Sequence, residues 1–143
     1  MTRSAELTRL VDYWHTLTPA TVDAITTVYT EDAYFRDPFN EVTGIEKIRP
    51  IFADMFVRLR EPKFTIIETI EQSHGALLIW DFTFRLKALK PDLSRRIHGT
   101  SHIRFGPDGR VQYHRDYWDA AGELYEQLPW VGSLMRFLKK RAG

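Results

Sequence analysis

The sequence predicts an α+β domain in which three helices come first and a mainly antiparallel sheet follows. Apolar residues recur at spacings of three and four up to about Leu59, and at every second position in the segments from Phe64 onwards. Turns containing glycine, proline or aspartate separate the later segments, and short connections between long strands are typical of antiparallel neighbours. A length of 143 residues suits one domain with a buried core. We therefore treat residues 1–143 as a single domain.

Three helices are expected before the sheet. The first runs from Ser4, its N-cap, to Thr16. The second begins near Thr18 and Pro19, because proline is favoured at the first helical position, and runs to about Tyr29. The third covers residues 44–59, whose apolar side chains follow one helical face.

Five strands are expected after or between these helices. A residue before proline is disfavoured in helices, so Asp37, which precedes Pro38, should end a short strand over residues 33–36, and a loop should follow over 38–43. Four longer strands are expected at residues 64–71, 77–89, 95–105 and 111–119. Residues 119–143 then form a C-terminal helical extension of two short helices divided near Pro129.

Alternation along the strands assigns side chains to the two faces of the sheet. The face toward the helices receives Trp80, Phe82 and Phe84 from one strand, and His114, Asp116 and Trp118 from the last. The outer face is flat and amphipathic, and it carries Asp81, Arg85, His98, His102, Arg104, Tyr113, Arg115 and Tyr117.

The composition excludes several classes of function. A net charge of +1 gives no field that would attract nucleic acid, and the absence of cysteine excludes disulfides and thiolate metal sites. No apolar run approaches the length of about 20 residues that a membrane span requires, and no signal sequence is recognisable, so we expect a cytoplasmic protein. His114 and Asp116 are metal-ligand types without a third partner at suitable spacing, so neither a metal nor a cofactor is expected.

Asp37 is the first candidate for chemistry, because it lies among aromatic residues in the segment 33–39. A carboxyl group in an apolar setting has its charged form disfavoured, which suits proton transfer. The alternative is an ordinary turn residue whose oxygens accept hydrogen bonds from nearby amides. The sequence leaves both interpretations open.

The order of elements and the segment 28–38 resemble the nuclear transport factor 2-like superfamily, and within it the SnoaL-like and ketosteroid isomerase-like branch. The resemblance covers residues 7–118 and implies a cone-shaped fold of three helices on a curved sheet. It places Asp37 at the position of the isomerase general base. Tyr13, which precedes Asp37 by 37 − 13 = 24 positions, falls on the tyrosine that stabilises the dienolate oxygen.

The same resemblance extends to the later strands with a change. Ser101 occupies the position of the isomerase's protonated aspartic acid, which a hydroxyl does not replace with equal strength. His114 and Asp116 fall at pocket-facing positions, and the ending over residues 113–119 looks typical of SnoaL-like proteins. In polyketide cyclases of that group an acidic residue on this part of the sheet serves as the base.

These residues define the expected site. The catalytic candidates are Asp37, Asp116, Tyr13 and His114. The expected lining of an apolar pocket is Trp14, Phe39, Phe52, Phe56, Trp80, Phe82, Ser101 and Trp118.

The leading hypothesis is a small-molecule-binding SnoaL-like protein that acts as a cofactor-independent acid–base isomerase or cyclase, or as a related lyase or hydrolase, on an apolar cyclic or polyketide-like compound. The alternative is a non-catalytic ligand-binding or dimerisation module. A homodimer through the outer sheet face is expected in either case, as in relatives. A third hypothesis, membrane-surface binding by the basic helix over residues 131–141, is weaker because cations in a last helical turn also suit the helix dipole.

Overall fold

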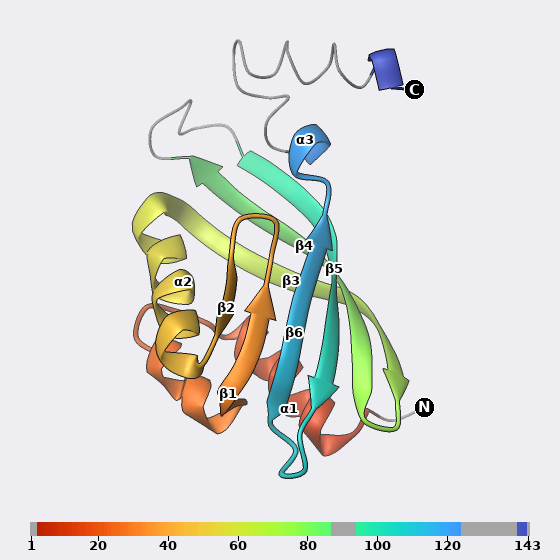
Figure 1. Ribbon diagram of the computed structural model, residues 1–143. Coiled ribbons are helices and arrows are strands. Elements are labelled where there is room, and N and C mark those ends of the chain that lie inside the picture. The colour runs from red at the N-terminus through yellow and green to blue at the C-terminus, as the bar shows by residue number, and fades with distance from the viewer. Residues whose placement is uncertain (1–2, 87–93, 124–139, 143) are drawn as a thin grey trace.

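The computed structural model describes residues 3–86, 94–123 and 140–142. Helices cover one face of a curved sheet of six strands in the order β2-β1-β6-β5-β4-β3 (Figure 1). This is the α+β cone architecture that the sequence predicted, so the predicted fold class is confirmed. The elements are α1 (Ala5–His15), η1 (Val22–Thr27), β1 (Tyr29–Arg36), β2 (Glu41–Thr43), α2 (Ile45–Arg58), β3 (Leu59–Gln72), β4 (Gly75–Leu86), β5 (Ser94–Phe105), β6 (Val111–Trp118) and α3 (Ala120–Glu123).

The first helix forms where it was predicted. The Ser4 hydroxyl accepts a hydrogen bond from the backbone amide of Leu7 at 3.2 Å, which caps α1 at its N-terminus. Leu7, Leu10 and Trp14 are buried along one face of the helix. The helical period therefore directs Trp14 into the interior.

The predicted second helix is wrong in type and length. Only a 3₁₀-helix, η1, forms there, and β1 already begins at Tyr29. The chain from Thr26 to Tyr29 is rich in β-branched and aromatic residues, which favour strands. Val111 donates a backbone hydrogen bond to Val28 at 2.7 Å, and Tyr29 then pairs with Val111 as β1 runs parallel to β6.

The region after β1 differs from the prediction in one respect. β1 ends at Arg36 as expected, but the predicted loop over 38–43 contains the short strand β2, which pairs antiparallel with β1. Gly44 then has a φ of 102°, a conformation that favours glycine, and α2 begins at the next residue.

The four later strands are confirmed as antiparallel neighbours, with ends that differ from the prediction by a few residues. The turns near Ser73 and near Gly106 are also confirmed. The predicted turn near Pro91 lies outside the described residues. So does most of the predicted C-terminal extension, including Pro129 and the greater part of the basic helix over 131–141, while α3 is the described part of its beginning.

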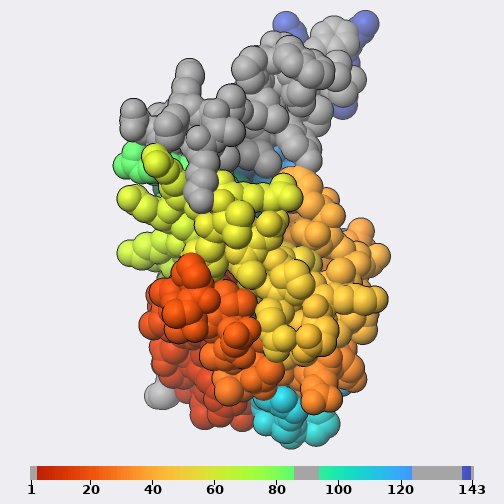
Figure 2. Space-filling model, turned by 90° about the vertical axis from the view of Figure 1, so that its left-hand side faces the viewer, coloured from red at the N-terminus to blue at the C-terminus, as the bar shows by residue number. Residues whose placement is uncertain are grey.

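The inner face of the sheet forms the core together with the helices. Trp80, Phe82 and Phe84 are buried on this face, as the alternation predicted. Seen from the side in Figure 2, the covering layer consists mainly of the N-terminal part of the chain, coloured red to yellow. None of the described helices is long and apolar enough to cross a membrane.

Candidate functional site

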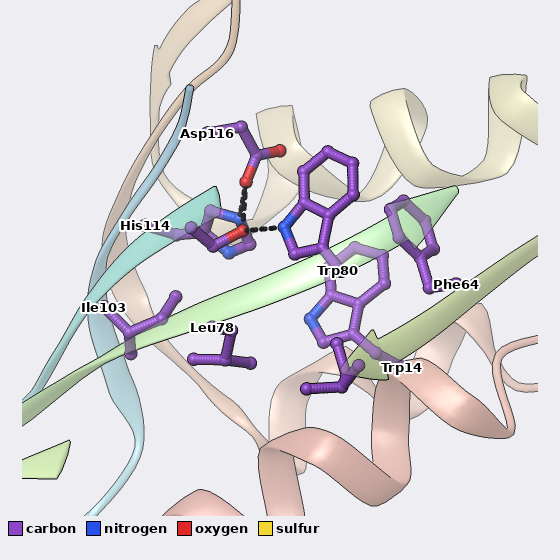
Figure 3. A pocket seen from close by; sticks show the side chains of 9 residues that line it. Trp14, Phe64, Leu78, Trp80, Ile103, His114 and Asp116 are labelled. Atoms are coloured by element: carbon purple, nitrogen blue, oxygen red, sulfur yellow. Dashed lines mark hydrogen bonds and ion pairs between the residues drawn. The ribbon is translucent and has the colours of Figure 1, made fainter. Parts of the chain in front are cut away.

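Asp116 is the centre of a hydrogen-bonded group on the inner face of the sheet. Its Oδ1 atom accepts from the Ser101 hydroxyl at 2.5 Å and lies 2.6 Å from Nε2 of His114. Ser101 is the cross-strand neighbour of Asp116 in the β5–β6 pair, and His114 precedes Asp116 by two residues on the same face of β6. Figure 3 shows Asp116, His114 and the Trp80 indole directed toward one another.

Two chains of hydrogen bonds, here called branches, lead to Oδ1 of Asp116. Trp80 lies at the start of the branch that passes through Ser101. Its indole Nε1–H donates to the Ser101 hydroxyl at 2.8 Å. Trp80 lies opposite Gly99 in the β4–β5 pair, and a Cβ atom at Gly99 would come within 2.7 Å of Cζ2 of the indole ring. The absent side chain at Gly99 therefore lets the indole lie across β5 and reach Ser101.

Tyr29 and Trp14 form the second branch. The Tyr29 hydroxyl lies 2.8 Å from Nδ1 of His114, and the Trp14 Nε1–H donates to that hydroxyl at 3.2 Å. Tyr29 is fully buried and its ring lies nearly parallel to His114, at 19°. Burial raises the pKa of Tyr29 well above its ordinary value, although the Trp14 hydrogen bond opposes this effect. The hydroxyl is therefore neutral and can donate to His114.

The two branches converge on one carboxylate oxygen. A tryptophan N–H is a donor only, so the direction of each branch is set at its outer end by Trp14 or by Trp80. Asp116 Oδ1 receives both branches, while its Oδ2 atom accepts no hydrogen bond from the described residues.

A small inner cavity adjoins this group. The space open to the centre of a water molecule is about 10 Å³, roughly what a single water requires. Its walls are Trp14, Phe64, Ile66, Leu78, Trp80, Ser101, Ile103, His114 and Asp116. This inner cavity is thus too small for an organic ligand.

A larger and more open cleft also has Asp116 in its wall. Its volume is about 470 Å³ by the same measure, which is in the range of small-molecule sites. Its walls are Arg36, Asp37, Pro38, Arg115, Asp116, Tyr117 and Trp118, at the end of β1 and along the last residues of β6. Asp116 is a wall residue of both spaces.

Asp37 also lines this cleft, but its oxygens are occupied by a turn. Oδ1 accepts from the backbone amides of Phe39 and Asn40, both at 2.7 Å, and the Asn40 side-chain amide contacts both oxygens. This is the turn geometry that the sequence left as the alternative interpretation.

The family model of the SnoaL-like domain matches residues 10–114 of this chain. The chain belongs to this SnoaL-like family. No curated protein matches it significantly.

Solved structures share the fold of this SnoaL-like chain. One is a protein of Catenulispora acidiphila DSM 44928 with a ketosteroid isomerase-like fold, in complex with trimethylamine. Its TM-score is 0.72 at 16% identity, and the alignment covers 86% of this chain and 92% of that protein's chain. A putative SnoaL-like polyketide cyclase of Shewanella denitrificans OS-217 gives 0.70 at 20%, with 87% and 100% covered. An LEH-like epoxide hydrolase of M. tuberculosis gives 0.65 at 13%, with 82% and 83% covered.

Tyr13 does not join the group around Asp116. Its hydroxyl donates to the backbone carbonyl of Val22 at 3.3 Å, and it lines neither cavity. Burial, and to a smaller extent the charge of Asp23, raise the pKa of Tyr13 above its ordinary value. Tyr29, which the sequence reasoning assigned to the end of a helix, supplies the buried hydroxyl beside His114 instead.

The other predicted lining residues divide between the core and the cleft. Phe52 and Phe82 are buried and pack against aromatic neighbours, and Phe56 packs at the edge of the core. Phe39 is 51% exposed and contacts Trp118 edge-on, with the ring centroids 5.5 Å apart. Within the described part of the chain, no group of three or more potential ligands is arranged to hold a metal ion.

Proposed function

We propose that this SnoaL-like protein binds a ring-containing small molecule in the cleft beside Trp118 and moves a proton on it, with Asp116 as the base. One observation carries this proposal: two tryptophan-anchored branches fix Oδ1 of Asp116, while the same residue lines an open cleft. Proton transfer needs a base that is both held in place and accessible to the ligand.

Asp116 suits this role better than Asp37. The four contacts within the 37–40 turn occupy both oxygens of Asp37, whereas Oδ2 of Asp116 has no such partner among the described residues. His114 and Ser101 orient the base and are positioning residues. A positioned base contributes a factor of about 10²–10⁴ to the rate.

A second candidate function is ligand binding or assembly without catalysis. The observation in its favour is the small size of the inner cavity, whose volume of about 10 Å³ holds no more than about one water molecule. In that case the cleft binds a ligand, and the buried network serves only to stabilise the core.

The test begins with native mass spectrometry of the purified protein to identify a co-purified ligand, whose turnover is then measured. Asp116→Asn should retain the fold, by circular dichroism, and the ligand, but lose turnover by about 10²–10⁴-fold. Full turnover by this variant sinks the role of Asp116 as base. A ligand that the wild type binds and never converts favours the second candidate.

We also propose a homodimer through the β3 and β4 part of the outer sheet face, with the pair Ile70 and Leu77 at its centre, which leaves Arg115 on β6 open to the cleft. These neighbours on β3 and β4 are 48% and 36% exposed, and exposed apolar groups side by side on a sheet face suit a self-interface. Leu77→Lys should lower the mass found by analytical ultracentrifugation to that of a monomer. The control Val57→Lys lies on α2, away from this face, and a monomeric wild type would refute the dimer.

A further inference from the structure

Arg115 brings the N–H groups of its guanidinium to the cleft. No carboxylate of the described residues accepts a hydrogen bond from them. Its guanidinium lies over the Tyr117 ring, 4.6 Å from the centroid, and no ion pair joins it to the described acidic residues. Stacking on a ring face leaves the in-plane N–H groups of a guanidinium available. Both Arg115 and Tyr117 line the cleft.

The other charges of the cleft are already engaged. Arg36 lies 3.6 Å from a carboxylate oxygen of Glu41, and the oxygens of Asp37 accept hydrogen bonds within their turn. Asp116 keeps only Oδ2 for a ligand. The polar groups of the cleft that remain available to a ligand are thus the guanidinium of Arg115 and Oδ2 of Asp116.

The remaining wall of the cleft is apolar. Pro38 and Trp118 contribute ring surfaces, and Phe39 extends this surface by its edge-on contact with Trp118. A ligand that satisfies both parts needs a ring system at one end and an anionic, planar oxygen pair at the other.

We propose that the ligand class is a ring-containing carboxylic acid, whose carboxylate Arg115 holds while its ring lies against Trp118. A planar guanidinium fits a carboxylate with two parallel hydrogen bonds, which gives orientation as well as affinity. This inference rests on the proposed function, since it takes the cleft as the ligand site and specifies the chemistry of the ligand. The carboxylate anchor then fixes the part of the ring system that Asp116 Oδ2 meets.

The test compares two probes of nearly equal shape, 2-naphthoate and the neutral 2-naphthamide, by isothermal titration calorimetry. The wild type should bind 2-naphthoate about tenfold or more tightly than 2-naphthamide, because hydrogen bonds to charged groups contribute more than neutral ones. Arg115→Gln should abolish this preference and leave 2-naphthamide binding within about twofold of the wild type. Added salt should weaken binding of the naphthoate more than that of the amide.

Arg104→Gln is the matched control. Arg104 also lies over a tyrosine ring, that of Tyr113 at 5.9 Å, but it does not line the cleft, so this variant should keep the wild-type preference. Equal binding of the two probes to the wild type, a preference that persists in Arg115→Gln, or no binding of either probe would overturn the carboxylate proposal.

The role of Asp116 as base is tested separately, by measuring the turnover of the Asp116→Asn variant. That variant should bind 2-naphthoate more tightly than the wild type, because a negative charge beside the cleft is removed.

Discussion

His114 and Asp116 are two residues apart on β6, and Nε2 of the first lies 2.6 Å from Oδ1 of the second. On the far side of the ring, Nδ1 faces the hydroxyl of Tyr29, which already accepts from Trp14. The Tyr29 hydrogen is then free to be donated to Nδ1. The state consistent with these hydrogen bonds is a neutral imidazole with its proton on Nε2, donated to Oδ1 of Asp116.

The alternative imidazolium state leaves the Tyr29 hydroxyl hydrogen without an acceptor among the described residues. Both ring nitrogens would then donate, and the Tyr29 hydroxyl would accept from Trp14 and from His114. Tyr29 is 0% exposed, and an unpaired buried polar group costs about 1–3 kcal/mol. The tryptophan at the end of the branch therefore controls the tautomer of the histidine next to the base.

Replacing the Tyr29 hydroxyl tests this chain of donors. Tyr29→Phe removes the donor to His114 Nδ1 and the acceptor of the Trp14 N–H, so we expect the free energy of unfolding to fall by about 1–3 kcal/mol in urea. The ¹⁵N shifts of His114 should move away from a single Nε2–H tautomer. Tyr13→Phe, which loses only a 3.3 Å bond to Val22, should leave those shifts in place. A wild-type His114 protonated on Nδ1 would contradict this account.

Replacing Asp37 or Asp116 by asparagine should have different effects on turnover. Asp37→Asn keeps an oxygen that accepts the turn amides, so its stability should stay within about 0.5 kcal/mol of the wild type and turnover of the identified ligand should fall by less than about tenfold. Asp37→Ala removes that acceptor and should cost about 0.5–2 kcal/mol. Asp116→Asn should also lose little stability, but its turnover should fall by about 10²–10⁴-fold. If Asp37→Asn is the more damaging to turnover, the assignment of the base moves to Asp37.

The inner face of the sheet was predictable because it depends on a period of two and not on the exact ends of strands. Ser101, His114 and Asp116 keep their side of the sheet when a strand begins or ends a few residues away. The cross-strand neighbours Ser101 and Asp116 come from an antiparallel pair joined by a short turn, so their contact is local in topology.

Tyr29 was missed because its role depends on a pairing distant in sequence. It reaches His114 across 85 positions through the parallel β1–β6 pair, and the segment before it reads equally well as a helix. The sequence could not place the Tyr13 hydroxyl for a different reason. Its spacing from Asp37 agreed with the family pattern, but spacing does not determine where a hydroxyl points, and here it reaches the Val22 carbonyl.

The missing side chain at Gly99 should be required for the position of Trp80. In Gly99→Ala the new Cβ atom would overlap the indole, with Cζ2 at 2.7 Å, and strain of this kind costs about 1–3 kcal/mol. We also expect the indole N–H resonance of Trp80 to shift as its bond to Ser101 lengthens. Gly106→Ala is the control, because its nearest neighbour would lie at 3.5 Å, an ordinary contact. Unchanged stability and an unchanged Trp80 resonance in Gly99→Ala would show that the indole is not held in this way.

Alkaline pH should unfold the protein through its buried phenols. Burial raises the pKa of Tyr29 and of Tyr13 above the ordinary 10.0, so the folded state keeps both hydroxyls neutral while the unfolded chain ionises them. This contribution to stability is complete below the unfolded pKa of about 10 and is lost as pH rises toward the raised folded values.

The measurement is the free energy of unfolding in urea at about pH 8 and about pH 11. Tyr29→Phe should be less stable than the wild type at the lower pH, where both phenols are neutral, but should lose less stability between the two pH values because one ionising group is gone. Tyr13→Phe should reduce the loss in the same way, and phenolate absorbance should rise together with unfolding. A loss between the two pH values that is the same in both variants as in the wild type would mean that other groups, and not these phenols, control alkaline unfolding.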